Sequence, residues 1–195
     1  MYKLSFYCLI ISIFFLSCDN SSSIIDPFCK ETKWFETAGN FEREDEILMS
    51  LSAQLLLDTS LQAYKDQNTI VSFAIDHSLD IQKTTSGLYY VLLSEGEGEL
   101  ADWGDYVSAH YRGYFLNGET FDSSCKKNEP LSFYIGNMIT GWNEGLQILK
   151  PGGKVLLLIP SRLAYGEEGL KDAKGNYLVP QNEVLAFDVE LVEIL

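Results

Sequence analysis

A set of aromatic side chains marks the part of the chain that could do chemistry. Trp142 follows a glycine in a segment of helical character, and aromatic residues recur on the segments that flank it, namely Tyr111, Phe121, Phe133, Tyr165 and Phe187. Such a set can line a pocket that holds an apolar group. It can equally fill the core of a β-rich domain, because large aromatic residues are common core residues. The order of the segments decides between the two interpretations.

The segments around these residues have the patterns of strands and one short helix. Residues 105–115 alternate between apolar and polar side chains, and Asn117 with Gly118 then gives a strong β-hairpin signal. Further strands are predicted over residues 88–93, 120–122, 131–135, 155–159 and 184–195, and a short helix carries Trp142. About five or six antiparallel strands with one helix predict an α+β domain, with the pocket between the helix and the sheet.

The composition limits the partners. The chain has 195 residues and is 46% hydrophobic, which suffices for one buried domain with a smaller appendage. It carries 14 basic and 28 acidic residues, a formal net charge of −14. That charge repels the phosphates of nucleic acids, so no nucleic-acid partner is expected.

The beginning of the chain has the pattern of an export signal. Lys3 precedes an apolar run that is too short to span a bilayer comfortably, and Phe15 lies near its end, shortly before Cys18. The run resembles a bacterial lipobox, in which the cysteine is acylated, although Phe15 departs from the usual aliphatic residue. We expect a signal peptide at residues 1–17 and lipidation of Cys18. A free cysteine at the end of an uncleaved anchor helix is the alternative.

Two segments of different character follow. Residues 18–40 are serine-rich at first and lack periodicity, which predicts a lipidated tether without fixed structure. Apolar residues then recur at helical spacing over residues 42–64, and Asp66 and Asn68 offer a cap for a second helical run. We expect these helices to form an arm over residues 41–82.

The apolar stripe of the arm is too long to be buried by one short contact with a domain. It predicts dimerisation through the arm or capture of client chains, whereas packing of Leu48, Leu51 and Leu55 within the protein is the alternative. His77 has no metal-binding residue at matching spacing and is expected to be a half-exposed surface residue.

The remaining cysteines are Cys29 and Cys125. Export would bring them into a compartment where they could pair. The sequence does not show that their Cα atoms approach closely enough, so a disulfide and two free thiols both stay open.

Three motifs occur in a familiar order. They comprise Val107, Ala109, His110, Tyr111, Arg112, Gly113, Asn117, Gly118, Phe121, Asp122, Ser123 and Ser124; then Phe133, Ile139, Gly141, Trp142, Glu144 and Gly145; and last Pro160, Ala164, Tyr165, Gly166, Pro180, Leu185, Phe187, Asp188, Val189, Glu190 and Leu191. This series resembles the FKBP-type peptidyl-prolyl cis/trans isomerases and covers residues 84–195. With the arm, it is similar to exported bacterial members of that family. The resemblance implies a half-wrapped antiparallel sheet around a short helix, over residues 83–195.

The resemblance also implies a role for each residue of the pocket. Trp142 would form the floor of a proline pocket, and Met138 and Ile139 would form its rim. The walls would come from Tyr111, Phe121, Phe133 and Phe187. Catalysis would depend on Tyr165, whose hydroxyl binds one substrate carbonyl while the Ile139 N–H binds a second, and on Asp122 beside the isomerising bond. Alternatively, Asp122 caps the end of a hairpin and Tyr165 is a core residue. No cofactor or metal is expected.

Two departures from the family pattern concern the choice of peptide. Leu131 stands where many members carry an aromatic residue, and the loop over residues 166–180 is longer and more polar than in compact members.

The leading expectation is a prolyl isomerase that assists the folding of exported, proline-containing polypeptides. It would be lipid-anchored in the cell envelope, facing the periplasm or the cell surface. A chaperone that captures unfolded chains without catalysis is the first alternative. An accessory lipoprotein of a surface machinery is the second.

Overall fold

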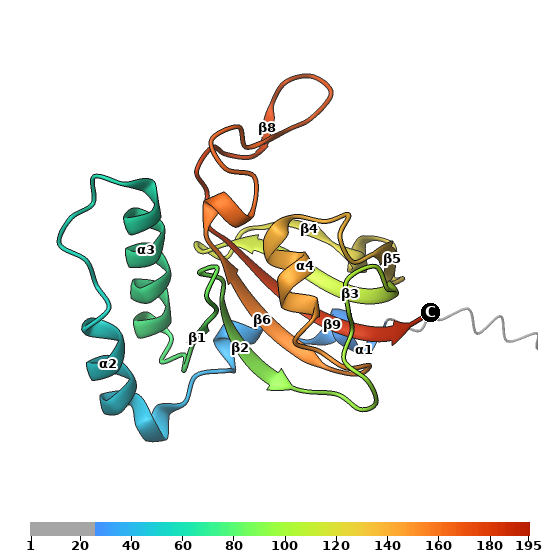
Figure 1. Cartoon of the computed structure of the whole chain (residues 1–195), viewed down its shortest axis with the longest axis horizontal. Helices are drawn as coiled ribbons and strands as arrows, with labels where there is room; N and C mark the ends of the chain where they lie inside the picture. The colour runs from blue at the N-terminus through green and yellow to red at the C-terminus, as the bar shows by residue number, and fades with distance from the viewer. Residues whose placement is uncertain (1–25) are drawn as a thin grey trace, which may run out of the picture.

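The structure is a computed structural model and describes residues 26–195. A curved antiparallel sheet with a short helix on one face forms the main body, and two helices of the arm stand beside it (Figure 1). The predicted α+β class is confirmed. Within residues 26–195, no helix combines the length and the apolar character that crossing a membrane requires.

The main sheet has the strand order β1-β2-β6-β9-β3-β4, with β5 also paired to β3. Its strands are β1 (Gln82–Lys83), β2 (Tyr89–Ser94), β3 (Tyr106–Phe115), β4 (Thr120–Ser123), β5 (Leu131–Tyr134), β6 (Lys154–Ile159) and β9 (Leu185–Ile194). Every neighbouring pair is antiparallel. The first half of β3 pairs with β5 and the second half with β4, so this one long strand positions residues on both.

Helix α4 (Thr140–Leu146) packs on one face of the sheet, over a core that includes Trp142, Leu146 and Phe187. Two glycines allow this close approach. A Cβ atom on Gly141 would lie 2.6 Å from the Ile159 side chain, and one on Gly145 would lie 2.6 Å from Leu157.

The opposite face of the sheet is covered by the arm, which contains α2 (Glu44–Ser52) and α3 (Gln62–Asp76). One continuous helix over residues 42–64 was the wrong prediction, because α2 ends at Ser52 and a loop follows. Asn68 stabilises that loop: its side chain accepts from the Leu56 N–H and donates to the Leu56 carbonyl, both at 2.8 Å. Asn68 and Asp66 therefore lie inside α3 and do not cap it.

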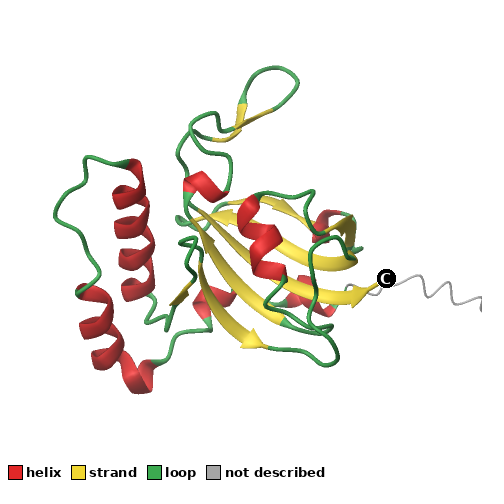
Figure 2. Cartoon of the chain, in the orientation of Figure 1, coloured by secondary structure: helices red, strands yellow, loops and turns green. Residues whose placement is uncertain are grey.

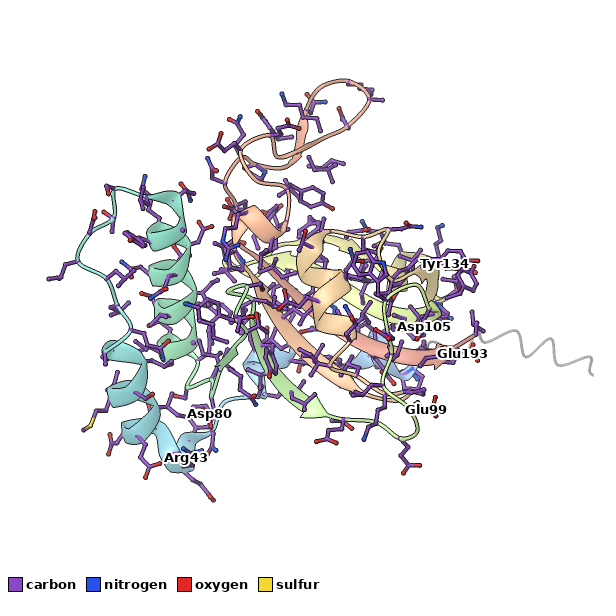
Figure 3. All side chains as sticks on the ribbon, viewed as in Figure 1. Arg43, Asp80, Glu99, Asp105, Tyr134 and Glu193 are labelled. Atoms are coloured by element: carbon purple, nitrogen blue, oxygen red, sulfur yellow. A yellow bond between two sulfur atoms is a disulfide. The ribbon has the colours of Figure 1, made fainter. Side chains whose placement is uncertain are left out.

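The arm is held together at its base and partly buried along its length. Arg43 donates to Asp80 at 2.9 Å, and the two residues lie close together at the base of the arm in Figure 3. Ile47 and Leu51 are buried, whereas Leu48 and Leu55 stay 45% and 41% exposed. Half-exposed His77 packs its ring against Phe35 and Phe73, with centroids 4.6 and 4.5 Å away.

Residues 26–40 form an ordered strap across the sheet, which contradicts the expected tether without fixed structure for this part of the segment. The strap contains α1 (Pro27–Lys30) and the 3-10 turn η1 (Trp34–Glu36), and it buries Phe28 and Trp34. A disulfide joins Cys29 to Cys125, with 5.5 Å between the Cα atoms. The burial of large aromatic rings and this covalent bond explain why the segment is ordered.

A buried carboxylate lies where the strap crosses the sheet. Asp188 accepts a hydrogen bond from the Tyr114 hydroxyl at 2.9 Å and from the Trp34 N–H at 3.3 Å, and Arg112 lies 3.6 Å away. Burial raises the pKa of Asp188 to about 7, against the opposing effect of these donors. Asp188, Glu190 and Glu193 alternate with apolar residues in β9, a pattern typical of a sheet with one solvent-facing side, but Asp188 is buried because the strap and the arm cover that face.

The expected long loop over residues 166–180 contains a small hairpin that the sequence did not predict. Its strands are β7 (Leu170–Lys171) and β8 (Tyr177–Val179), and it projects away from the main sheet (Figure 2). Tyr177 and Leu178 at its outer end are 46% and 52% exposed.

Candidate active site

A cavity of about 280 Å³ lies between α4 and the sheet. It is lined by Tyr111, Phe121, Asp122, Asn137, Met138, Ile139, Trp142, Tyr165 and Phe187. The structure thus brings together all the predicted site side chains of the domain except Phe133, which packs behind Trp142. The predicted lipidation site, Cys18, lies outside the described residues.

Trp142 forms the bottom of the cavity and is 2% exposed. Three rings pack against it, Tyr111 and Phe187 in edge-type contacts with centroids at 5.1 and 5.4 Å, and Phe133 in a tilted contact at 5.6 Å. Ile139 precedes the helix, and its carbonyl accepts the Trp142 N–H at 3.0 Å, which fixes the start of α4. The indole is therefore held on several sides and is ordered before any ligand binds.

One wall of the cavity comes from three neighbouring strands. Phe121 of β4 and Phe187 of β9 meet edge to face at 5.6 Å, above Gly113 of β3. A Cβ atom on Gly113 would lie 2.5 Å from the Phe187 ring and 2.8 Å from the Phe121 ring. Only glycine leaves room for both rings at this point.

The polar side of the cavity is organised around Asp122. The Tyr111 hydroxyl donates to its Oδ2 at 2.7 Å, and Lys126 donates to its Oδ1 at 3.3 Å. Burial on its own would raise the pKa of Asp122, but the hydrogen bonds and the lysine charge outweigh it and hold the pKa below the usual range. Burial, with the adjacent carboxylate, raises the pKa of the Tyr111 hydroxyl. At neutral pH the cavity therefore has a charged acceptor on one side and a protonated phenol beside it.

Tyr165 enters the cavity from the turn after β6. Burial, with the charge of Asp122, raises the pKa of its hydroxyl, which stays protonated at neutral pH. Among residues 26–195, no group exchanges a hydrogen bond with this hydroxyl or accepts one from the Ile139 N–H. Both donors are available to a ligand.

Asn143 is a site residue that the sequence analysis missed. Its Oδ1 accepts from the Gly136 N–H at 2.8 Å and the Met138 N–H at 3.2 Å, and its Nδ2 donates to the Met138 carbonyl at 2.7 Å. Asn143 is 6% exposed and fixes the loop that forms the rim of the cavity. A polar residue beside Trp142 in a short amphipathic helix was the available signal.

A second, more polar groove of about 540 Å³ adjoins the cavity and shares Tyr111 and Asp122 with it. Leu131, the residue that departs from the family pattern, lines this groove and not the aromatic cavity. A peptide held in the cavity could extend its flanking residues into the groove.

The part of the chain that the structure describes holds no cluster of three or more histidine, cysteine, aspartate or glutamate side chains placed to bind a metal. The site consists of aromatic surface, one carboxylate, two phenols and a free backbone N–H.

Comparison with known proteins agrees with this geometry. The family model described as FKBP-type peptidyl-prolyl cis-trans isomerase matches residues 97–192. The sequence is 34% identical to the FKBP-type isomerase FkpA of Escherichia coli K12 over 151 residues, which is 77% of this chain and 53% of FkpA. It is 40% identical to FkpA of Buchnera aphidicola subsp. Baizongia pistaciae over 115 residues, which is 59% of this chain and 43% of that protein. The chain thus spans about half the length of these relatives.

Solved structures show the same relationship. The crystal structure of FkpA from Escherichia coli matches with a TM-score of 0.58 and 32% identity, over 77% of this chain and 63% of that one. The crystal structure of AtFKBP13 matches with a TM-score of 0.54 and 36% identity, over 60% of this chain and 99% of that one. Because the match extends along nearly all of AtFKBP13 at 36% identity, the chain belongs to the family of FKBP-type peptidyl-prolyl cis-trans isomerases.

Proposed function

We propose that the protein catalyses the cis/trans isomerisation of X-Pro bonds in polypeptides. The observation that carries this proposal is the aromatic cavity over buried Trp142, which also presents the carboxylate of Asp122 and the hydroxyl of Tyr165. A pyrrolidine ring is apolar and compact, and it would pack on the indole while its two flanking carbonyls stay near these polar groups.

The physical task is to lower a rotational barrier. Amide resonance resists rotation about a peptide bond, with a barrier of ~18–20 kcal/mol, and no covalent bond has to break. Water stabilises the polar planar amide more than the twisted one, so an apolar cavity favours the twisted state. In this proposal the Tyr165 hydroxyl and the Ile139 N–H hold the flanking carbonyls, and Asp122 lies beside the rotating bond.

An isomerisation assay on short X-Pro peptides tests the proposal. A protease that cleaves only the trans peptide reports the rate, and two-dimensional exchange NMR confirms it without the protease. We expect acceleration that depends on the concentration of the chain and is mostly lost in Trp142→Ala. If X-Pro bonds isomerise at the uncatalysed rate at every concentration of the chain, the proposal is wrong.

The protein would act on exported chains while anchored in the cell envelope. The disulfide between Cys29 and Cys125 supports an oxidising compartment, because such bonds persist there and are rare in the cytosol. Residues 1–17 and Cys18, which carry the export and lipidation signals, lie outside the described residues. Two acyl chains on Cys18 would hold the protein at a membrane, whereas one chain binds only marginally.

Membrane fractionation with mass spectrometry tests the anchor. We expect Cys18→Ala to release the protein from the membrane fraction or to leave the signal uncleaved, and the parent to carry the mass of the acyl chains. Cys8→Ala, in the expected signal segment, is the matched control and should change neither result. Membrane retention of Cys18→Ala in the absence of acylation would favour a simple anchor helix.

Capture of unfolded chains by the arm, or dimerisation through it, is a second candidate function. The arm exposes large apolar side chains, including Met49 at 78% and Leu57 at 105%, where solubility would favour polar residues. Replacing both by serine should then weaken the suppression of client aggregation or shift the oligomeric state in light scattering. Leu100→Ser changes a residue that is 54% exposed outside the arm and is the control. If the arm variant matches this control in both assays, the arm has neither function.

A further inference from the structure

A carboxylate of the arm is buried against the isomerase domain. Asp66 lies on α3, which stands alongside the sheet (Figure 1), and it is 2% exposed. Its Oδ2 accepts two hydrogen bonds from Ser161, at 2.9 Å from the backbone N–H and at 2.6 Å from Oγ. Its Oδ1 accepts from Gln62 at 2.7 Å. Every donor to this carboxylate is therefore an uncharged group.

Ser161 is in turn the residue from which the turn carrying Tyr165 is built. It begins the 3-10 turn η4 (Ser161–Leu163) and is 1% exposed. Its carbonyl accepts the N–H of Ala164 at 3.0 Å and the N–H of Gly166 at 2.8 Å. These two residues flank Tyr165 in the chain. The N–H and the hydroxyl of Ser161 thus bind Asp66, while the Ser161 carbonyl holds the backbone on both sides of Tyr165.

A short turn depends strongly on such an anchor. It has few internal hydrogen bonds, and the position of a side chain at its end follows the position of its first residue. Hydrogen bonds to a carboxylate are shorter and stronger than neutral ones, and a buried carboxylate loses much of its stability when its donors move away. Asp66 therefore restrains Ser161 more tightly than a contact between two apolar surfaces would.

We propose that Asp66 is a positioning residue for Tyr165, so that the arm helps to build the active site. It acts through Ser161 and η4, and it sets where the Tyr165 hydroxyl lies in the cavity. The inference rests on the proposed function, in which that hydroxyl holds a substrate carbonyl. It gives α3 a part in catalysis that is separate from client capture or dimerisation.

Kinetics of the full chain test the proposal. Asp66→Ala should lower kcat about 10-fold with a smaller change in KM, because a small displacement of a catalytic group costs rate more than binding. Asp66→Asn keeps an oxygen acceptor for Ser161 and should recover most of kcat. Asp76→Ala removes an exposed carboxylate from the same helix and is the control, with kcat unchanged.

A double-mutant cycle separates positioning from general support. If Asp66 acts through the Tyr165 hydroxyl, Asp66→Ala should have little further effect on kcat in a Tyr165→Phe background. An equal loss in both backgrounds overturns the proposal, as does a folded Asp66→Ala chain with parent kcat. Should Asp66→Ala fail to fold, Ser161→Ala removes only the 2.6 Å hydrogen bond, and the same outcomes apply to it.

NMR of ring-labelled tyrosine gives a readout that needs no substrate. The Tyr165 signal, assigned by its loss in Tyr165→Phe, should shift in Asp66→Ala and not in Asp76→Ala. An unchanged signal overturns the proposal. A parent chain without isomerase activity would contradict the proposed function, and a shifted Tyr165 signal would then still show that Asp66 places the ring.

Discussion

The Tyr111 hydroxyl lies 2.7 Å from Oδ2 of Asp122 and fixes the orientation of that carboxylate at the mouth of the cavity. Because Lys126 occupies the other oxygen at 3.3 Å, both oxygens have a donor before any ligand binds. The pair is held by the antiparallel register of β3 and β4, in which Gly113 faces Asp122. A strand register therefore determines where the charge of the site lies.

The first prediction concerns Asp122 and Tyr165. Asp122→Ala and Tyr165→Phe should each lower kcat by more than they lower peptide affinity, because these groups are expected to hold the twisted amide better than the planar one. The combined loss should be smaller than the sum, since both groups act on one bound segment. Isomerisation rates and peptide titrations on the same four chains measure both quantities.

Parallel losses of kcat and affinity would instead indicate uniform binding, and would favour a holdase over a catalyst. A double variant with the parent rate and parent affinity would leave the aromatic surface as the only active element. Tyr134→Phe removes the hydroxyl of a tyrosine that is 53% exposed, packs against Tyr106 and does not line the cavity, and it is the control for Tyr165→Phe.

The second prediction concerns the floor of the cavity. Trp142→Ala should abolish most of the isomerase activity, and the loss of a large buried ring should cost ~3–5 kcal/mol of folding free energy. Urea unfolding has to accompany the kinetics for this reason. Trp103→Ala changes a tryptophan that is 65% exposed, and it should leave activity near that of the parent. Parent activity in a folded Trp142→Ala chain would refute the pocket assignment.

The third prediction concerns the pH dependence of stability through Asp188. Its pKa is raised from 3.8 in the unfolded chain to about 7 in the folded one, because of burial. The folded state thus binds this proton more tightly, so the contribution of Asp188 to stability is complete below its unfolded pKa and is lost as the pH rises to about 7. Asp188→Asn removes the titration and keeps the shape of the side chain.

Urea unfolding at a series of pH values measures this contribution. The free energy of unfolding of the parent, relative to Asp188→Asn, should fall by about 1 kcal/mol per pH unit between the two pKa values and stay constant above them. A difference that stays constant over the whole range would show that Asp188 has the same pKa in the folded and the unfolded chain, and would contradict the prediction.

The fourth prediction concerns the disulfide. The bond closes a loop with a sequence separation of 96, so its loss in Cys29→Ser with Cys125→Ser should cost about 4 kcal/mol of folding free energy. Thermal unfolding of the double variant, beside the parent with and without a reductant, measures the effect. The reduced parent should match the variant, and a parent that is insensitive to reductant would contradict the expected contribution.

Much of the sheet and the cavity could be predicted because the signals are local. Alternation of apolar and polar side chains predicted the long strands, and the order of the motifs placed Trp142 on a short helix under the rings of β3 and β9. Trp142 and Phe187 lie on elements far apart in sequence, and the resemblance to the family predicts that both line one pocket. In the structure their ring centroids lie 5.4 Å apart.

The parts that were missed depend on contacts between distant residues. Nothing local indicates that Trp34 will donate to Asp188, which lies 154 positions later, so the local patterns predict a tether in place of the strap and a solvent-facing acid at Asp188. The break between α2 and α3 has the same origin, since it depends on the two hydrogen bonds between Asn68 and Leu56. Asp66 was assigned to a cap because its partner, Ser161, is 95 positions away.

The position of β9 has a consequence for the order in which the protein becomes active. This strand comes last among the described strands in the chain, yet it lies between β6 and β3 and supplies Phe187 to the cavity. A chain that emerges from a translocation channel with its N-terminal end first has no sheet centre until residues 185–194 have left the channel. Under the proposed export, the cavity is incomplete while the protein's own chain is still emerging, so the proposed activity toward other chains would begin only after residues 185–194 have crossed.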